Sequence, residues 1–131
     1  VLVDGDDMTE PIADATRSIL DGHIVLSRKL ANKGHYPAID TLQSVSRVMP
    51  DIIDREHYLR AMRFNEILAT YREAEDLINI GAYAKGSNPQ IDHALSKINQ
   101  LRAYLKQDIF EKALYDQSVE RLNQIIDSPL L

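Results

Sequence analysis

The chain has 131 residues and a formal net charge of −5, and its acidic residues are spread along the sequence. A nucleic-acid-binding surface needs a basic patch or stripe, so this charge pattern argues against nucleic acid as a partner. The absence of cysteine excludes a disulfide framework and a thiolate zinc site. No apolar run approaches the roughly 20 residues of a membrane-spanning helix, and the many Leu, Ile and Ala residues favour a mainly helical protein.

The first fifty residues have a pattern of short strands and helices. Residues 1–3 are an apolar run typical of the end of a buried strand, and the chain begins there with Val, so we expect a fragment of a longer protein. Thr9 is placed to cap a helix that has Pro11 in its first turn, and Gly22 is expected to end it. The apolar face of this helix consists of Ile12, Ala15, Thr16, Ile19 and Leu20.

A second strand and a second helix follow the first pair. Residues 23–26 predict a short buried strand, Ser27 is suited to cap the next helix, and Gly34 is suited to end it. The order strand, helix, strand, helix is typical of an α/β layer. Because two strands cannot close such a layer, we expect most of the sheet to lie upstream of residue 1.

After residue 50 the pattern becomes helical. No Gly or Pro interrupts residues 54–80, and apolar residues recur there at helical spacing. The predicted inward stripe consists of Ala61, Phe64, Ile67, Leu68, Tyr71, Ala74 and Ile78. The acidic residues Glu73, Glu75 and Asp76 are expected to lie on the solvated face of this helix.

Two further helices complete a predicted bundle. Asn88 is suited to cap the second helix and Pro89 to open it. The inward face of that helix consists of Ile91, Ala94, Leu95, Ile98, Leu101 and Leu105. The third helix is predicted over residues 109–126, with Leu114, Leu122, Ile125 and Ile126 inward. Three amphipathic helices with short links form a small bundle, so we predict a mainly α chain with a boundary near residues 49–54.

Tyr36 and Arg47 are the residues with the most distinctive chemistry. Pro37 restricts the backbone of Tyr36 to an extended conformation, which sets the direction of the ring. Arg47 stands beside Ser46 and near Ser44, where its guanidinium can reach outward. An exposed planar cation of this kind suits a phosphate. On residue type alone, the favoured interpretation is a surface loop that contains a packing Tyr and a solvated Arg.

Other interpretations of the sequence also remain open. Arg47 could form an ion pair with Asp40 or with Asp51. The chain contains no phosphate-binding Gly-x-x-x-x-Gly-Lys-Ser/Thr loop and no Gly-x-Ser-x-Gly nucleophile motif, and its four histidines lack metal-ligand spacing. The residues by themselves therefore favour a binding or assembly element over a complete enzyme.

Several blocks of the sequence carry a family resemblance. Residues 21–28 (Asp-Gly-His-Ile-Val-Leu-Ser-Arg), 34–40 (Gly-His-Tyr-Pro-Ala-Ile-Asp) and 44–48 (Ser-Val-Ser-Arg-Val) resemble the C-terminal part of the type III export ATPases. Residues 71–83 (Tyr-Arg-Glu-Ala-Glu-Asp-Leu-Ile-Asn-Ile-Gly-Ala-Tyr) resemble the flagellar branch in particular. These ATPases drive flagellar assembly and the virulence injectisome, and they are related to the catalytic subunits of rotary ATP synthases.

The resemblance implies a domain organisation and an activity. Residues 1–50 would be the C-terminal remnant of a RecA-like ATPase domain, and residues 54–131 would be a C-terminal helical domain. The full-length protein would hydrolyse ATP, with ATP or ADP and Mg²⁺ bound between neighbouring subunits of a hexameric ring. Because the phosphate-binding loop and the metal-binding acid lie upstream in the family, the fragment alone is expected to be inactive and to bind no cofactor tightly.

The resemblance also implies roles for three residues. Arg47 matches the arginine finger of the family, which stabilises charge on the γ-phosphate in the adjoining subunit's site. Tyr36 matches the ring that stacks on adenine. Tyr83, together with Leu77 and Ile78, lies in the region that matches the part of the helical bundle lining the base pocket.

Partners and location follow from the same resemblance. The protein would be cytoplasmic and peripheral at the membrane-embedded export apparatus, where it would contact export-apparatus proteins, chaperones and cargo. The alternative is a non-catalytic helical interaction or assembly module of a secretion apparatus. A Gly-x-x-x-x-Gly-Lys-Thr loop far upstream would distinguish the ATPase from that alternative.

Overall fold

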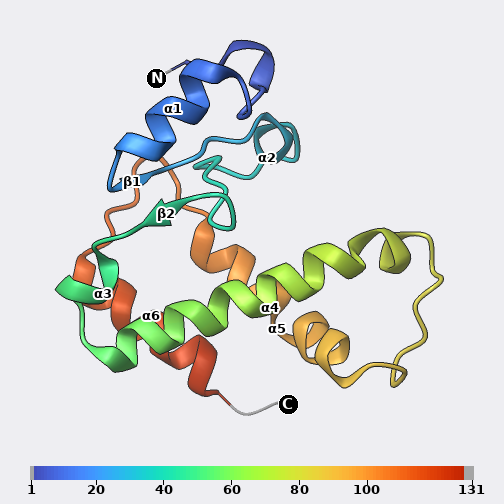
Figure 1. Cartoon of the computed structure of the whole chain (residues 1–131). Helices are drawn as coiled ribbons and strands as arrows, with labels where there is room; N and C mark the ends of the chain where they lie inside the picture. Colours follow the sequence, from blue (N-terminus) through green and yellow to red (C-terminus); the bar gives the residue numbers. More distant parts are fainter. Residues whose placement is uncertain (1, 129–131) are drawn as a thin grey trace.

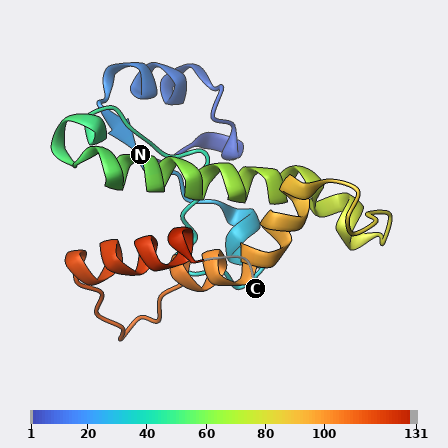
Figure 2. The ribbon, with the colours of Figure 1, turned by 90° about the horizontal axis from the view of Figure 1, so that it is seen from below.

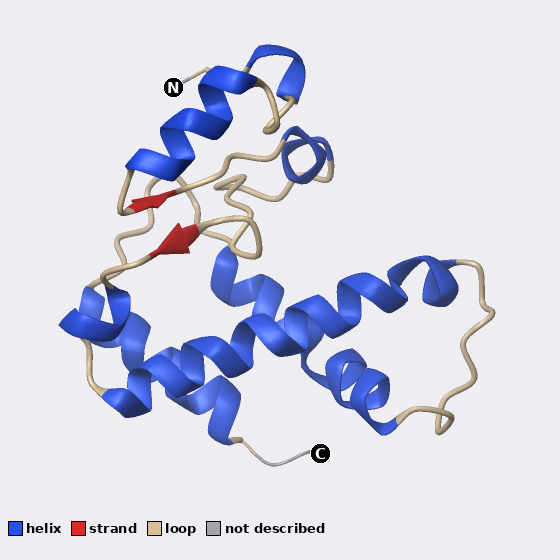
Figure 3. Cartoon of the chain, in the orientation of Figure 1, coloured by secondary structure: helices blue, strands red, loops and turns tan. Residues whose placement is uncertain are grey.

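The computed structural model describes residues 2–128, and this part of the chain is mainly α, with two short strands (Figures 1 and 3). A 3-10 turn η1 (Asp4–Asp6) is followed by helices α1 (Pro11–Ile19), α2 (Arg28–Asn32), α3 (Met49–Ile52), α4 (Arg55–Asn79), α5 (Pro89–Leu105) and α6 (Tyr115–Asp127). Strands β1 (Gly22–His23) and β2 (Val45–Ser46) pair antiparallel. The predicted fold class is confirmed. None of the helices in the described residues has the length and apolar character needed to cross a membrane.

Helix α2 begins and ends as the sequence predicts. The side chain of Ser27 caps it, because its Oγ accepts a hydrogen bond from the backbone N of Leu30 at 3.3 Å. Gly34 follows the last turn with φ of +68°, a left-handed conformation that glycine adopts without steric cost. The chain therefore leaves α2 at Gly34 and continues into the loop of residues 34–44.

The predicted cap of α1 is wrong by one residue. The N-cap is Glu10, whose carboxylate accepts a hydrogen bond from the backbone N of Ala13 at 3.1 Å. Thr9 is already engaged, because its hydroxyl donates to Oδ1 of Asp7 at 2.6 Å. Pro11 occupies the first helical turn as predicted.

The second predicted strand is shorter and far less buried than expected. Only Gly22–His23 pairs with β2, and Gly22 lies in this ladder instead of ending α1. A Cβ at Gly22 would meet the carbonyl oxygen of Val45 at 2.6 Å, so the close approach of the strands requires glycine. Ile24 and Leu26 are each 73% exposed. An apolar run indicates which side chains can be buried, but burial requires a covering element. None of the described elements covers Ile24 and Leu26.

The first predicted strand and the predicted apolar face of α1 show the same difference. Val1 lies outside the described residues, Leu2 is exposed, and neither Leu2 nor Val3 is in a strand. On α1, Ile12 and Ile19 are also largely exposed. Ile12 and Ile19 have the spacing of a buried face, but most of their surface is exposed in the described chain.

Helix α4 forms as predicted. Asp54 is its N-cap and accepts a hydrogen bond from the backbone N of His57 at 2.7 Å. The helix then continues for 25 residues to Asn79. The core of the predicted stripe is buried and consists of Phe64, Ile67, Leu68, Tyr71 and Ala74. Helical periodicity is a reliable guide here because α5 and α6 both pack against this face.

Helix α5 also confirms its predicted start. Oδ1 of Asn88 accepts hydrogen bonds from the backbone N atoms of Gln90 and Ile91 at 2.9 and 3.3 Å, and Pro89 opens the helix. The loop before it turns at Gly81 and Gly86, which have φ of +71° and +92°. The buried residues of α5 are Ala94, Lys97, Ile98 and Leu101.

The start of the third bundle helix is wrong by six residues. Helix α6 begins at Tyr115, and the preceding link leaves Ile109, Phe110 and Leu114 exposed. Asp108 is the physical reason, since its Oδ1 accepts a hydrogen bond from the backbone N of Phe110 at 2.9 Å. An Asp side chain that bonds to the backbone two residues later favours a turn over a helix.

The three long helices enclose the hydrophobic core, with α5 and α6 packed against α4 (Figure 2). The core is completed by Leu122 and Ile125 of α6. Lys97 of α5 is buried among them, and its Nζ donates to the carbonyl oxygens of Ile125 and Ser128 at 2.8 and 2.7 Å. This ammonium satisfies backbone acceptors at the C-terminal end of α6 and so joins α5 to α6.

Candidate functional site

The loop that contains Tyr36 and Arg47 is held to its surroundings by backbone hydrogen bonds. The backbone N of Ser27 donates to the carbonyl of Ala38 at 2.8 Å, and the backbone N of Asp40 donates to the carbonyl of Val25 at 2.8 Å. These bonds align residues 25–27 antiparallel with residues 38–40, with an isolated bridge between Leu26 and Ile39. These contacts fix the loop against the segment that follows β1.

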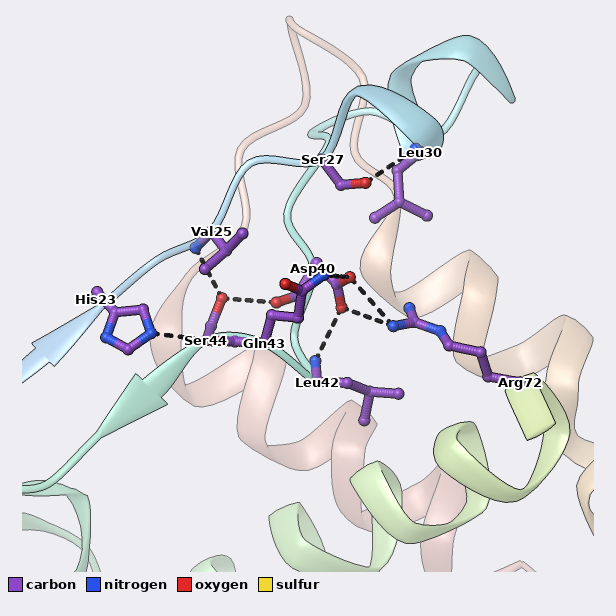
Figure 4. Close-up of polar contacts among 9 residues, drawn as sticks. All are labelled: His23, Val25, Ser27, Leu30, Asp40, Leu42, Gln43, Ser44 and Arg72. Carbon is purple, nitrogen blue, oxygen red and sulfur yellow. Dashed lines mark hydrogen bonds and ion pairs between the residues drawn. The ribbon is translucent and has the colours of Figure 1, made fainter. Parts of the chain in front are cut away.

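Asp40 is the centre of the polar network in this loop (Figure 4). Its side chain is buried, and its carboxylate accepts hydrogen bonds from Nε2 of Gln43 at 2.8 Å and from the backbone N of Leu42 at 3.1 Å. Nη1 of Arg72 donates to both carboxylate oxygens, at 3.0 and 3.1 Å. Burial raises the pKa of Asp40, but the hydrogen bonds from Gln43 and Arg72 outweigh it and hold this pKa below its usual value.

Arg47 lies immediately after β2 and is exposed. Its backbone N donates to the carbonyl of Asp21 at 2.8 Å, which fixes where the residue leaves the ladder. The predicted alternative of an ion pair is wrong for both partners. Asp40 pairs with Arg72 instead, and the described part of the chain has no salt bridge between Arg47 and Asp51 or any other acid. In the described chain the guanidinium is thus exposed and has no acidic partner.

Tyr36 is 59% exposed and lies against the link between α5 and α6. Its carbonyl oxygen accepts a hydrogen bond from the backbone N of Gln107 at 3.0 Å. Two and three residues later, Ile109 and Phe110 present exposed apolar side chains. The peptide bond between Tyr36 and Pro37 is cis. The exposed ring of Tyr36 and the exposed side chains of Ile109 and Phe110 therefore belong to two segments that are joined by this hydrogen bond.

Tyr83 lies in a different part of the molecule. Its hydroxyl is 2.9 Å from Oδ1 of Asp92 and 3.0 Å from the carbonyl oxygen of Asn88, at the N-terminal end of α5. Tyr36 contacts the chain just beyond the other end of the same helix. From Asp92 to Leu105 the helix rises about 20 Å at 1.5 Å per residue. Within one chain, the structure therefore does not bring Tyr36 and Tyr83 together.

The acidic residues on α4 differ from one another. Glu73 and Asp76 are exposed, as predicted, but the side chain of Glu75 is not on a solvated face. Its carboxylate pairs with Nζ of Lys33 at 3.2 Å and with Nη2 of Arg102 at 3.4 Å. The prediction failed because helical spacing does not reveal that Lys33, 42 residues earlier in the sequence, packs beside this turn.

A cavity of about 660 Å³ is lined by residues between Ser27 and Gln43 and by residues of α4 and α5. His35 lies in its lining and is buried, and burial, followed by the charges of Lys106 and Arg102, lowers the pKa of His35. The lowered pKa favours the neutral imidazole. The described residues contain no group of three or more His, Asp or Glu side chains arranged to hold a metal ion. The groups of this site that could contact a ligand are the exposed ring of Tyr36 and the exposed guanidinium of Arg47.

The sequence interpretation missed two features of this site. One is the ion pair of Asp40 with Arg72, which lies 32 residues later. The other is the contact of Tyr36 with the link after α5. A signal for the first is that Arg72 follows the buried Tyr71, so it lies at the edge of the inward stripe, although spacing alone does not identify its partner.

Two family models match the chain. The model of the T3SS EscN ATPase C-terminal domain matches residues 53–124, and the model of the ATP synthase alpha/beta family nucleotide-binding domain matches residues 1–46. Among curated relatives, the flagellum-specific ATP synthase of Bacillus subtilis (strain 168) is 54% identical over 125 residues, which are 95% of this chain and 28% of that protein. The type 3 secretion system ATPase of Pseudomonas syringae pv. syringae is 42% identical over 125 residues, again 95% of this chain and 28% of that protein.

Solved structures of one relative match the whole arrangement. The assembled ATPase EscN from the enteropathogenic E. coli type III secretion system superposes with a TM-score of 0.91 at 39% identity, covering 96% of this chain and 31% of that one. The same ATPase in complex with its central stalk EscO gives a TM-score of 0.83 at 39% identity, covering 89% of this chain and 29% of that one.

The chain spans less than a third of the length of these relatives. The match to the helical family model nevertheless covers more than half of this chain and includes the whole of α4 and α5, and the matched structure has the same arrangement of loop and helices. The chain therefore belongs to the family of the T3SS EscN ATPase C-terminal domain.

Proposed function

We propose that this chain is the C-terminal part of an ATPase that energises flagellar type III protein export. The observation that carries the proposal is Arg47, an exposed guanidinium that has no acidic partner in the described chain and whose backbone is fixed by β2 and by Asp21. A surface arginine held in this way suits a phosphate that another molecule presents. Relatives named as flagellum-specific ATP synthases and as a type 3 secretion system ATPase support this role.

The proposed role of Arg47 is that of an arginine finger acting in trans. The phosphate would belong to ATP in the adjoining subunit of a hexameric ring, and Arg47 would stabilise the charge that develops on the γ-phosphate. Fingers of this kind contribute ~10³ to 10⁵ in rate. The name of the matched structure, an assembled ATPase, supports an oligomer. The Mg²⁺ that accompanies ATP would be held by upstream residues.

Tyr36 is proposed to stack on the adenine base. Its exposed ring meets the requirement, and the link after α5 offers Ile109 and Phe110 as a second apolar wall near the contact of Tyr36 with Gln107. The resemblance also assigns Tyr83 to this pocket. Its hydroxyl bonds and its place at the other end of α5 favour a role in holding the loop between α4 and α5, so the proposal for the base rests on Tyr36.

The proposed domain division is residues 1–50 and residues 54–131. The exposed apolar side chains of α1 and of the segment after β1 fit the edge of a larger RecA-like domain, and the two family matches divide the chain at a similar point. The fragment lacks a phosphate-binding loop, so we expect no ATP hydrolysis by the fragment alone.

The helical domain is proposed to contact other proteins of the export apparatus, including chaperones and cargo. Its polar outer faces suit transient contacts, and the complex of a relative with its central stalk EscO supports a partner of the stalk type. The protein would act on the cytoplasmic side of the membrane, peripheral to the export apparatus. The identity of 54% to a flagellar relative and 42% to a secretion relative supports the flagellar branch.

The decisive experiment mixes two full-length variants of strongly reduced activity, Arg47→Ala and one that lacks the lysine of the upstream phosphate-binding loop. Some interfaces in mixed rings would contain neither lesion, so ATPase activity should partly return. Arg47→Lys should also be inactive, because an ammonium cannot replace the planar guanidinium. As a matched control, Arg63→Ala removes an exposed arginine of α4 and should keep full activity. If rings that exchange subunits regain nothing, Arg47 does not act across a boundary. An Arg47→Ala variant with full ATPase activity would show that Arg47 is not an arginine finger.

A further inference from the structure

The charged contact between Arg72 and Asp40 lies at the boundary between the loop and the helical part (Figure 4). Asp40 belongs to the loop segment, and Arg72 belongs to the third-last turn of α4. The side chain of Asp40 is only 5% exposed, whereas that of Arg72 is 39% exposed. The acid is therefore the buried partner, and its charge depends on donors that reach it from two parts of the molecule.

Asp40 also fixes the backbone on both sides of itself. Its N donates to the carbonyl of Val25, and its carbonyl accepts from the hydroxyl of Ser44 at 2.7 Å. The same hydroxyl accepts from the backbone N of Val25 at 3.0 Å. One residue thus connects the segment after β1, the turn at residues 40–44 and, through Arg72, helix α4.

The two proposed ligand-contacting residues flank this connection. Tyr36 precedes Asp40 by four residues, and Arg47 follows it by seven. The turn leads directly into β2, whose end places Arg47 against Asp21. A shift of Asp40 relative to α4 would therefore change the direction of the backbone that carries Arg47.

We infer that Arg72 is a positioning residue, which holds the Asp40 turn on helix α4 and thereby sets where Arg47 stands. The inference rests on the proposed function of Arg47. Arg72 acts through another residue and contacts no ligand itself. The second charged contact between the two parts, Lys33 with Glu75, joins α2 to α4 and does not include the turn that leads to Arg47.

The test uses full-length protein and steady-state ATPase kinetics. Arg72→Met should lower kcat about ten- to a hundredfold, because a catalytic group displaced by about 1 Å loses rate on that scale. Arg72→Lys should restore most of kcat, since Arg72 uses a single nitrogen, Nη1, for both oxygens of Asp40. The matched control is Arg60→Met. Arg60 is on the same helix and forms an ion pair with Asp127 of α6, so its loss should leave kcat within about twofold.

A double-variant cycle separates positioning from general stability. If Arg72 acts through Arg47, Arg72→Met should lower the residual activity of an Arg47→Ala enzyme by less than about twofold. An equal loss in both backgrounds, or an equal loss in Arg60→Met, would overturn the inference. Should Arg72→Met fold poorly, Asp40→Asn replaces it, with the same loss of kcat expected and the same cycle with Arg47→Ala. If Arg47→Ala alone retains full activity, the proposed function fails first, which distinguishes the two outcomes.

Discussion

Residues 2–48 and residues 54–128 keep their structure by different means. The helical part buries a continuous apolar core between α4, α5 and α6. In the described N-terminal part, Ala13 is the only buried apolar residue, and the other buried residues there are His35 and Asp40. The loop is stabilised by backbone hydrogen bonds and by the hydrogen bonds of the Asp40 carboxylate, whereas the bundle is stabilised by side-chain packing.

The difference explains where a functional loop can be placed. A loop that is stabilised by backbone hydrogen bonds leaves its side chains free, and Tyr36 and Arg47 are both exposed. In the bundle the tyrosine at position 71 is buried, and the arginine at position 102 lies over its ring at 4.8 Å. Tyr36 and Arg47 are thus exposed to solvent, whereas Tyr71 and Arg102 pack against each other.

The comparison predicts its largest effect for the core. Leu101 is fully buried in α5, so Leu101→Ala should lower the free energy of unfolding by ~2 to 5 kcal/mol. Ile24→Ala in the exposed segment should change it by less than about 0.5 kcal/mol. Urea unfolding of the 131-residue chain measures both variants. Similar losses for the two would mean that the N-terminal segment is covered in solution.

A smaller effect is expected from the buried amine of α5. Lys97→Met removes three hydrogen bonds, to the carbonyls of Ile125 and Ser128 and to the hydroxyl of Ser128, and leaves acceptors without a partner. The free energy of unfolding should fall by ~1 to 3 kcal/mol. Lys106→Met, an exposed lysine just after the same helix, is the control and should stay within about 0.5 kcal/mol. Equal values would show that the buried amine adds nothing.

Tyrosine substitutions should separate ligand binding from folding. In the full-length enzyme, Tyr36→Ala should raise KM for ATP by an amount equivalent to ~1 to 3 kcal/mol, the scale of base stacking on an aromatic ring, and should largely spare kcat. Its melting temperature should stay close to that of the parent, whereas Tyr71→Ala should lower it strongly because that ring is in the core. A loss of kcat with unchanged KM would place Tyr36 in the chemistry or in folding.

The smallest expected effect is a pH dependence at the contact between the two regions. The folded-state pKa of Asp40 lies below the usual value of 3.8, so its contribution to stability is complete above that pH and is lost as the pH falls through the folded pKa. The parent chain should therefore lose stability more steeply than Asp40→Asn below about pH 4. Urea midpoints between neutral pH and about pH 2.5 provide the measurement. Parallel curves would show that the pKa of Asp40 is not lowered in the folded chain.

Prediction from sequence succeeded where a feature depends on near neighbours. Ser27 and Asn88 cap the helices that follow them, as predicted, because a cap bonds backbone atoms only two or three residues away. The predicted start of the third bundle helix is wrong, because Asp108 forms a local turn in a stretch whose apolar residues predict a helix. Exposure was misjudged at Ile24, because periodicity reports what a side chain could bury and not whether a covering element is present.

The candidate site likewise has features that the sequence predicts and features that only the tertiary structure decides. Arg47 and Tyr36 are recognisable from short blocks of sequence, since each block places one chemical group beside a Pro or a pair of serines. Their environment is not recognisable in that way. The pairing of Asp40 with Arg72 and the contact of Tyr36 with Gln107 join residues 32 and 71 positions apart, and only the packing of α4 and α5 against the loop brings them within hydrogen-bond distance. Local chemistry follows from the order of residues, whereas the partner of a charge depends on which surfaces the hydrophobic core brings together.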